Sequence, residues 1–486
     1  MDQDDAESQR KMLDRSGLPV GEEDLAVPLM GKDLEVKVVS PKPPPAACQS
    51  TPPSAKDRWY GWVVVAATFV INVIVAGYVK SFGLFYLPIV QQFPNTSVAT
   101  GGLIVGLLTG CRGLLAPAMG LLMVWLGPRV CSVCGGMLTA LGFLLALPAT
   151  SVLHLAITLG ALVGVGLSMS ETPGFIMISE YFDERRSTAN GFRAAGNPFG
   201  GAVFPFIVVF LSRELPLKGI ILILSGIMLQ ICVLGMLLRP FPIHQKIIEQ
   251  EYFKNITSNS HTNQIKQPSQ PISPIEEDNS PKQKKAVQLS VLKNPVYLVY
   301  IVMIVCTNAG LANTMFYLIL YSASIDLTQT QISFIVGFIS ILDVFGRMMI
   351  GWISDTNCVK RRYIFILGHV VAGLSTLMVP VTRSFWTLLP VVCVHAMGVA
   401  AFWALINTLL ADQFGEESLH TTWGFFRMVQ GITSFAYPSL LGLVSDMSGW
   451  MGAPFLLIGS MYLLGGLVFA LQPIVIKVSG IKVPLT

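Results

Sequence analysis

The sequence predicts an all-α polytopic membrane protein with twelve transmembrane helices in two six-helix halves. Of its 486 residues, 52% are hydrophobic and only 12% are charged, whereas a soluble protein carries about 25% charged residues. Apolar runs of about 20 to 26 residues recur along the chain, each long enough to cross a bilayer as a helix. A long polar segment divides these runs into two blocks of almost equal length.

Each predicted helix corresponds to one apolar run. The runs lack the period-two alternation of a membrane β-barrel, so helices remain the only way to satisfy the backbone in lipid. We expect the spans, in order, at approximately residues 60–87, 99–123, 130–149, 153–178, 187–211, 218–238, 296–320, 331–353, 363–381, 386–411, 421–445 and 453–475.

Three segments lie outside the membrane. Residues 1–58 are partly acidic and partly Pro-rich, without the apolar core of a signal peptide, and we expect a disordered tail there. Residues 241–292 are charged and rich in Ser, Pro and Gln, so we expect a flexible linker between a first half at 59–240 and a second half at 293–475. Residues 476–486 form a short tail.

The loop charges predict the orientation. On one face the loops carry Arg129, Arg185, Arg186, Lys360, Arg361 and Arg362, whereas the other carries Arg213, Lys218 and Arg383. The positive-inside rule therefore places both termini and the linker in the cytoplasm. Asn255 then lies in a cytoplasmic sequon that stays unmodified, and Asn95 in the first outer loop is a candidate glycosylation acceptor.

The sequence offers little support for an enzyme. Its eight cysteines are scattered, and Cys131 and Cys134 fit helix packing better than redox or metal chemistry. No zinc-protease motif, Walker loop, nucleophile elbow or dinucleotide loop occurs in a suitable context. We therefore expect no catalytic activity, cofactor, metal site or nucleic-acid partner.

Charged residues lie inside several of the predicted spans, where each costs roughly 2.5 to 3.5 kcal/mol at a helix centre. Among them are Lys80, Arg112, Glu171, Arg193, Asp343, Arg347 and Arg427. Arg193 and Arg427 lie near cytoplasmic ends, so we expect them to snorkel or to pair with loop carboxylates. Arg112 and Glu171 lie deeper, and a structural pair and a cavity lining both remain open.

Asp343 and Arg347 are four residues apart in SILDVFGRMMIGWISD and share one helix face. They could simply neutralise each other, but a buried pair is often no better than apolar replacements. A transport site explains them better, since a guanidinium matches a carboxylate and an Asp can carry a proton. Lys80 adds a second positive charge from the other half. We therefore predict a cycle in which Arg347 binds an anion, Asp343 carries a proton and Lys80 alternates with them.

Three stretches resemble the monocarboxylate transporters of the major facilitator superfamily over about residues 59–475. They are YFDERRSTANGFRAAGNPFGG at 181–201, AGYVKSFGLFYLPI around Lys80, and LDVFGRMMIG with Asp343 and Arg347. The resemblance implies the superfamily fold with its two halves, and substrate and proton binding at Lys80, Asp343 and Arg347. It also allows for a single-pass glycoprotein that escorts the carrier to the plasma membrane.

The chain departs from the family pattern in several places. KDRWYGW, residues 56–62, lacks the central glycines with which the family opens its first span. Arg112 is unusual for the family, and the bulky Phe402 and Trp403 stand near the lactate pocket of related members. We take Arg112, Glu171, Phe402 and Trp403 as candidates for lining the pocket.

A cytoplasmic gate is indicated by GWISDTNCVKRR and by the arginines of YFDERR. Asp355 lies about 120° around the helix from Asp343, so we expect it to pair with Arg361 or Arg362 rather than to bind substrate. Arg185 and Arg186 have the local character of the same gate.

Our leading hypothesis is proton-linked symport of a short-chain monocarboxylate, such as lactate, pyruvate or a ketone body, by alternating access at the plasma membrane. The alternative is proton-independent transport of a larger or zwitterionic solute, such as an amino acid, creatine or carnitine. Lys80 argues against that alternative, whereas Arg112 and Trp403 favour it. A membrane scaffold that no longer transports is disfavoured by the intact charge triad.

Overall fold

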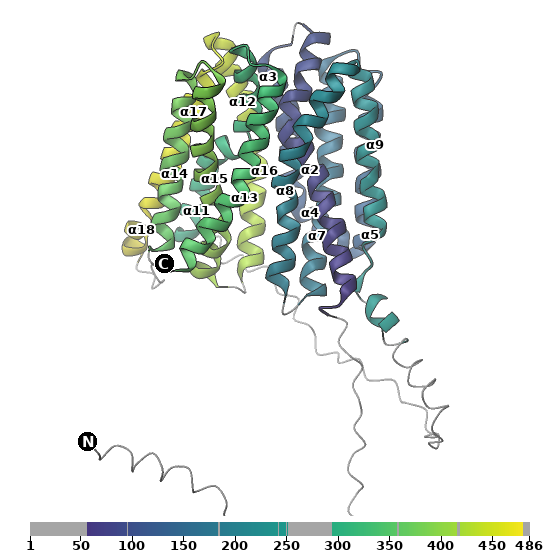
Figure 1. The fold of residues 1–486 in the computed structure, drawn as a ribbon. Helices are drawn as coiled ribbons and strands as arrows, with labels where there is room; N and C mark the ends of the chain where they lie inside the picture. Colours follow the sequence, from purple (N-terminus) through teal and green to yellow (C-terminus); the bar gives the residue numbers. More distant parts are fainter. Residues whose placement is uncertain are drawn as a thin grey trace, which may run out of the picture. The chain divides into compact units, whose positions relative to one another are not determined.

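The computed structural model describes residues 56–94, 96–182, 185–241, 243–248, 250, 294–356, 359–415 and 418–479. Within these ranges the regular structure is entirely helical, and long helices run side by side through the bundle (Figure 1). The all-helical class is therefore confirmed. The predicted tail at 1–58 and the linker at 241–292 fall largely outside the described residues, as does Asn95.

The first half contains the segments before the linker. They are α2 (Trp59–Gln92), α3 (Val98–Leu114), α4 (Ala116–Leu126), α5 (Pro128–Ala146), α6 (Val152–Leu155), the π-helix η1 (Ala156–Leu162), α7 (Val163–Tyr181), α8 (Arg186–Glu214) and α9 (Leu217–Met236). The second half contains α11 (Pro295–Leu311), α12 (Thr314–Ser324), α13 (Gln329–Asp355), α14 (Arg361–Met378), the 3-10 helix η3 (Val379–Val381), α15 (Phe385–Phe414), α16 (Leu419–Ser448), α17 (Ala453–Ala470) and α18 (Gln472–Ser479).

In the described part of the chain, ten helices are long and apolar enough to cross a membrane, and the pair α3 and α4 makes up to eleven. This pair is bent by 45°. The bend follows from Pro117 in the first turn of α4, because proline lacks an N–H and its ring clashes with the preceding turn. The remaining predicted span, 421–445, corresponds to α16, which is long enough but has polar residues such as Arg427 and Gln430 in its interior.

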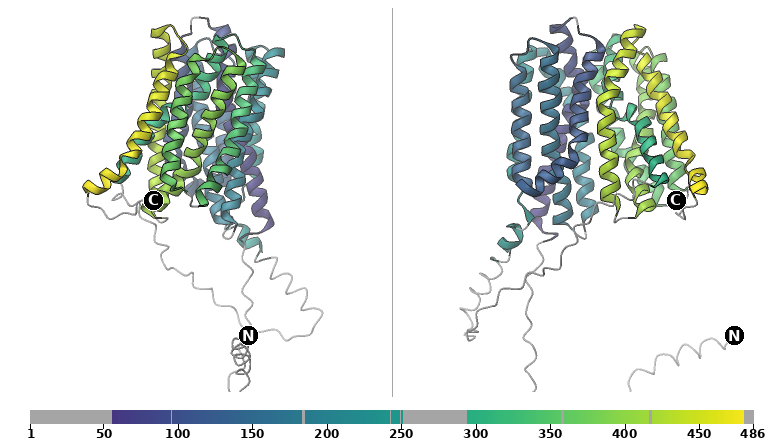
Figure 2. Two further views of the ribbon diagram at one scale, coloured as in Figure 1. Left: turned by 60° about the vertical axis from the view of Figure 1, so that its left-hand side comes forward. Right: turned by 180° about the vertical axis from the view of Figure 1, so that it is seen from behind.

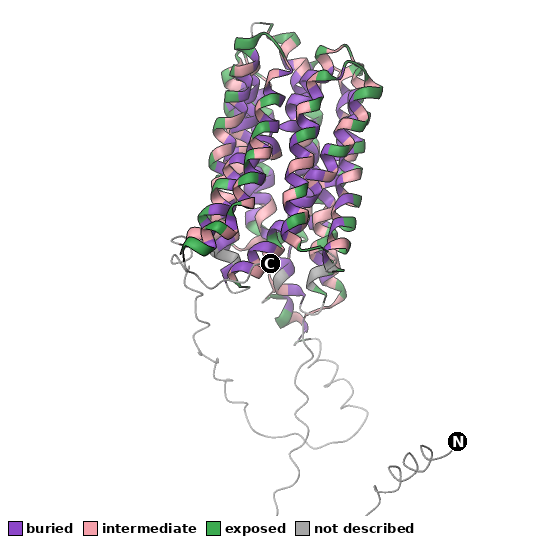
Figure 3. Cartoon of the chain, turned by 90° about the vertical axis from the view of Figure 1, so that its left-hand side faces the viewer, coloured by how far each residue is buried: buried purple, intermediate pink, exposed green. Residues whose placement is uncertain are grey.

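Side chains that face neighbouring helices differ in exposure from those on the outer faces of the bundle. Buried positions line the sides on which helices meet, and exposed positions lie on outer faces (Figure 3). Many exposed side chains are large and apolar, including Leu121, Met348 and Trp386. This pattern suits a bundle surrounded by hydrocarbon rather than water.

The two halves lie side by side and meet mainly through α3 against α16 and α8 against α13 (Figure 2). Glycines bring the backbones close. A Cβ atom added at Gly102 would lie 2.3 Å from the carbonyl oxygen of Pro438, and one at Gly113 would lie 2.7 Å from the Cα atom of Gly431. In lipid there is no hydrophobic driving force for helices to associate. Close backbone packing of this kind stabilises their contact instead.

We call the end with Arg129, Arg185, Lys360 and Arg361 the basic end, and the end with Arg213, Lys218 and Arg383 the opposite end. Three further sets of bonds join the halves. The carboxylate of Asp446 accepts hydrogen bonds from the backbone N–H groups of Val98 and Ala99, both at 3.0 Å, and so caps α3. Arg213 donates to Thr330, and Ser333 donates to the carbonyl oxygen of Pro205 at 3.4 Å. All of these bonds lie toward the opposite end.

The contact between α3 and α16 can be tested with a matched pair of substitutions. Gly113→Leu forces its side chain into the backbone of α16, and overpacking of this kind costs about 1 to 3 kcal/mol. Gly120→Leu is the control, because a Cβ atom at Gly120 has nothing within 4 Å. We expect the thermal unfolding temperature of the purified protein to fall for Gly113→Leu only. Equal effects of the two changes would contradict the packing described above.

Candidate functional site

Asp343 and Arg347 form the centre of the candidate site, on α13. Thr328 and Gln331 close a capping box at the start of this helix, and the helix continues unbroken to Asp355, so residues four apart share a face. Asp343 Oδ1 accepts from Arg347 Nε at 2.7 Å, and Asp343 Oδ2 accepts from Nη2 at 2.7 Å. The pair is therefore the two-pronged arrangement that holds a guanidinium in a fixed orientation.

Lys80 reaches this pair from the other half. Its Nζ atom lies 3.7 Å from Asp343 Oδ2. Gly201 on α8 leaves room for it, since an added Cβ atom would lie 2.6 Å from Lys80 Cδ and 2.4 Å from Ser340 Oγ. The structure thus brings together all three residues that the sequence singled out for substrate and proton.

The triad combines net positive charge with partial access. One carboxylate between two cations leaves a net charge of +1. The side chains of Lys80 and Arg347 are 22% and 28% exposed, although both lie in the middle of long helices. The ring of Trp403 lies beneath Arg347, with 5.7 Å between the guanidinium carbon and the ring centroid, so a cation–π contact further fixes the guanidinium.

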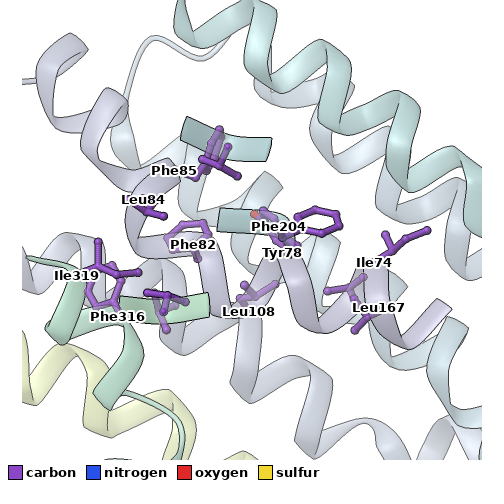
Figure 4. Packing of buried hydrophobic residues seen from close by; sticks show 14 of the residues in the cluster. Ile74, Tyr78, Phe82, Leu84, Phe85, Leu108, Leu167, Phe204, Phe316 and Ile319 are labelled. Atoms are coloured by element: carbon purple, nitrogen blue, oxygen red, sulfur yellow. The ribbon is translucent and has the colours of Figure 1, made fainter. Parts of the chain in front are cut away.

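Apolar side chains surround the Lys80 turn of α2. Tyr78 and Phe82, two residues before and after Lys80, point into a buried cluster with Phe204 and Phe316 (Figure 4). This packing fixes α2 and leaves the ammonium group to the charged side.

Ser340 was not singled out by the sequence. Its hydroxyl is buried beside Gly201 and has no hydrogen-bond partner among the described residues. Its position one turn before Asp343 was the only available signal, and serines are too common in membrane helices for that signal to be specific.

The two aromatic candidates for the pocket differ. Phe402 is only 2% exposed and packs against Phe365 and His369, within the core of the second half. Trp403 is half-buried and touches Arg347. Of the two, Trp403 is the one that adjoins the charged triad.

Arg112 and Glu171 form a second ionic centre, between α3 and α7. Arg112 Nε and Nη2 both donate to Glu171 Oε2, at 2.9 and 2.6 Å. Arg193 and Arg427 lie within electrostatic range of the same carboxylate. Arg193 donates to Asn190 at 3.0 Å and Arg427 donates to Gln430. Each of these two arginines thus bonds to a side-chain amide, and among the described residues no ion pair with a loop carboxylate is present for either.

The predicted gate residues lie at the basic end. Arg361 forms an ion pair with Asp412 at 2.7 Å, and Arg362 donates to the carbonyl oxygens of Phe469 and Ala470 at 3.3 and 2.8 Å. The backbone N–H of Arg185 donates to Asp57 at 3.3 Å. The side chains of Asp355 and Arg186 lie outside the described residues, so the pairing of Asp355 stays a prediction.

Comparisons with known proteins agree with this picture. A family model described as Major Facilitator Superfamily matches residues 61–382 and 304–475. Monocarboxylate transporter 12 of Mus musculus is 26% identical over 437 residues, which cover 89% of each chain. Monocarboxylate transporter 13 of Rattus norvegicus is 24% identical, over 86% of this chain and 90% of its own. Monocarboxylate transporter 2 of Mus musculus is 26% identical, over 85% and 84%. These relatives bear out the resemblance read from the motifs.

The coupling within the triad can be measured by a double-mutant cycle. Asp343→Asn leaves two adjacent cations without their counter-charge, so we expect a lower unfolding temperature. Combining it with Arg347→Gln removes one of those cations, and the double variant should be more stable than the sum of the single changes predicts, by about 0.5 to 3 kcal/mol. Arg213→Gln combined with Asp343→Asn serves as the distant control. Additivity in both pairs would contradict the coupling.

Proposed function

Because the chain belongs to the major facilitator superfamily, a family of membrane transporters and not of enzymes, we propose that it carries a short-chain monocarboxylate together with a proton. Lactate, pyruvate and ketone bodies are the expected substrates. One observation carries this proposal: Asp343 is shared by Arg347 of its own helix and Lys80 of the other half.

Arg347 is the proposed carboxylate-binding group. A guanidinium has five N–H donors, and Asp343 occupies one on Nε and one on Nη2. The Nη1 edge is left for an incoming carboxylate, which would meet the guanidinium in its own plane. The net charge of +1 on the triad supplies the long-range attraction for a monoanion.

Asp343 is the proposed proton carrier. The empty triad carries a net charge of +1, a bound monoanion lowers it to zero, and a proton on Asp343 restores it to +1. The empty and fully loaded sites therefore carry the same charge, so neither form is penalised relative to the other in the low-dielectric interior. A protonated Asp343 also holds both cations less strongly, which leaves Arg347 to the substrate and Lys80 free to move.

Alternating access would use the contact between the halves. Lys80 and Asp343 belong to different halves, so rocking of one half against the other changes their separation. The Asp446 cap on α3 and the contact of Arg213 with Thr330 join the halves toward the opposite end. We propose that this conformation faces the basic end, and that the basic end faces the cytoplasm at the plasma membrane, as the positive-inside rule predicts from the loop charges. Escort by a single-pass glycoprotein stays a prediction of the resemblance.

The second candidate is proton-independent transport of a larger or zwitterionic solute. The cation–π contact of Trp403 with Arg347 favours it, because an aromatic wall could also accept the ammonium group of such a solute. The contact of Lys80 with Asp343 favours the proton-linked function, since a carboxylate held by two cations releases them when it is protonated.

Uptake of radiolabelled L-lactate tests the proposal, in a host that lacks its own lactate carriers and at external pH values of about 6 and about 8. We expect faster uptake at the lower pH, because the proton is a co-substrate. Arg347→Lys keeps the charge but loses the planar fork, so uptake should fall about tenfold or more, as expected for about 1.5 kcal/mol of charged hydrogen bonding. Arg383→Lys, in an exposed loop, is the control. Lactate uptake that is unchanged both by external pH and by Arg347→Lys would exclude the proposal.

Asp343→Asn separates proton coupling from anion binding. The amide has the size of the carboxyl group but cannot take up a proton, so the remaining uptake should no longer rise as the external pH falls. His395→Gln is the matched control, because this histidine is buried against Thr376 at 3.0 Å and takes no part in the triad. A pH response that survives in Asp343→Asn and disappears in His395→Gln would assign the proton to a different group.

A further inference from the structure

The second ionic centre holds more positive charge than its carboxylate can balance. Three arginines, Arg112, Arg193 and Arg427, lie within electrostatic range of Glu171, so these four side chains carry a net charge of +2. Arg112 alone already gives Glu171 a double hydrogen bond. The other two cations are therefore not required to neutralise this carboxylate.

Helix packing brings the three arginines and Glu171 together from four helices, α3, α7, α8 and α16. The side chain of Arg193 on α8 lies against Gly174 on α7, where an added Cβ atom would be 4.0 Å from Arg193 Cδ, and over the ring of Phe175 at 5.3 Å. The backbone of Arg427 on α16 lies against Gly113 on α3, where an added Cβ atom would be 3.7 Å from the carbonyl oxygen of Arg427. Both arginines also lie within electrostatic range of Glu171, and Arg427 lies within range of Arg112.

Each of the two arginines keeps donors free. Arg193 uses Nε for Asn190, and Arg427 uses Nη1 for Gln430. Among the described residues neither makes a further hydrogen bond, and both side chains are half-buried. In a membrane interior, guanidinium groups whose donors and charge are not matched by any described residue are costly unless an anion completes them.

We propose that Arg193 and Arg427, with Glu171 and Arg112 as their fixed base, form a second anion-binding site that takes a small carboxylate. The choice of a carboxylate rests on the proposed function, whereas the excess of positive charge does not. Planar guanidinium groups suit a carboxylate better than a spherical ion, because they offer paired donors in one plane.

The second site is separate from the triad. The triad is built around Asp343 and the cluster around Glu171, and no ion pair between described residues joins the two sets. The cluster would therefore hold its own anion, as a station through which substrate is received or released.

Equilibrium binding of radiolabelled L-lactate to the purified full-length protein in lipid nanodiscs tests this site. We expect two lactate ions per wild-type chain, one in Arg347→Gln, one in the double variant Arg193→Gln/Arg427→Gln, and none when all three changes are combined. The double variant Arg193→Lys/Arg427→Lys keeps the charge and should retain weakened binding at the second site. Arg383→Gln is the control and should match wild type.

The outcomes separate this inference from the proposed function. Lactate binding that disappears in Arg347→Gln and is unchanged in Arg193→Gln/Arg427→Gln overturns the second site and leaves the proposed function standing. Binding that survives in Arg347→Gln and disappears in the double variant supports the second site even if the triad binds no lactate.

A measurement without substitutions covers the case in which the double variant does not fold. Phenylglyoxal modifies accessible arginines, and mass spectrometry of wild-type protein reports which ones. We expect lactate to slow the modification of Arg193 and Arg427 several-fold and to leave that of Arg383 unchanged. Equal rates with and without lactate at Arg193 and Arg427 would overturn the inference.

Discussion

A carboxylate inside a membrane keeps its charge only beside cations, and the sharing of Asp343 between Arg347 and Lys80 is the constraint on which this bundle depends. It requires α13 to be unbroken for many turns, so that two residues four apart share a face. It also requires a glycine on α8 at the point where the lysine passes. Because the two cations come from different halves, the charge balance of the site and the relative position of the halves cannot change independently.

The membrane environment also determines which groups form the contact between the two halves. Apolar side chains gain little by leaving lipid for another helix, so α3 and α16 meet through glycine and backbone carbonyl groups instead. Polar bonds are then left to fix the register. Apart from the contact of Lys80 with Asp343, the described ones, at Asp446, Arg213 and Ser333, lie toward one end. The two halves are therefore closely packed but gain little from apolar burial. Such an interface suits two halves that must separate and rejoin.

Periodicity and hydropathy predicted the helices and the pairing of Asp343 with Arg347, because both are local properties of the chain. The approach of Lys80 was expected only from the family resemblance and from its charge, since nothing local relates α2 to α13. The grouping of Arg193 and Arg427 around Glu171 was not predicted, because the sequence shows how far a residue lies from a helix end, but not which way it faces. Pro117 and the polar interior of α16 were visible in the sequence, yet the bend and the contact with α3 depend on tertiary packing.

The π-helix η1 precedes α7 and sets the direction in which the side chains of α7 point around the helix axis. A π turn holds more residues than an α turn, and each residue of an α-helix advances the direction of the side chain by about 100°. If this turn relaxed to α geometry, Glu171 would rotate away from Arg112 without any substitution at either position. The identity of the residues that face the centre is therefore set by the phase of one wide turn, and two chains with the same α7 sequence could present different chemistry if they differed only there.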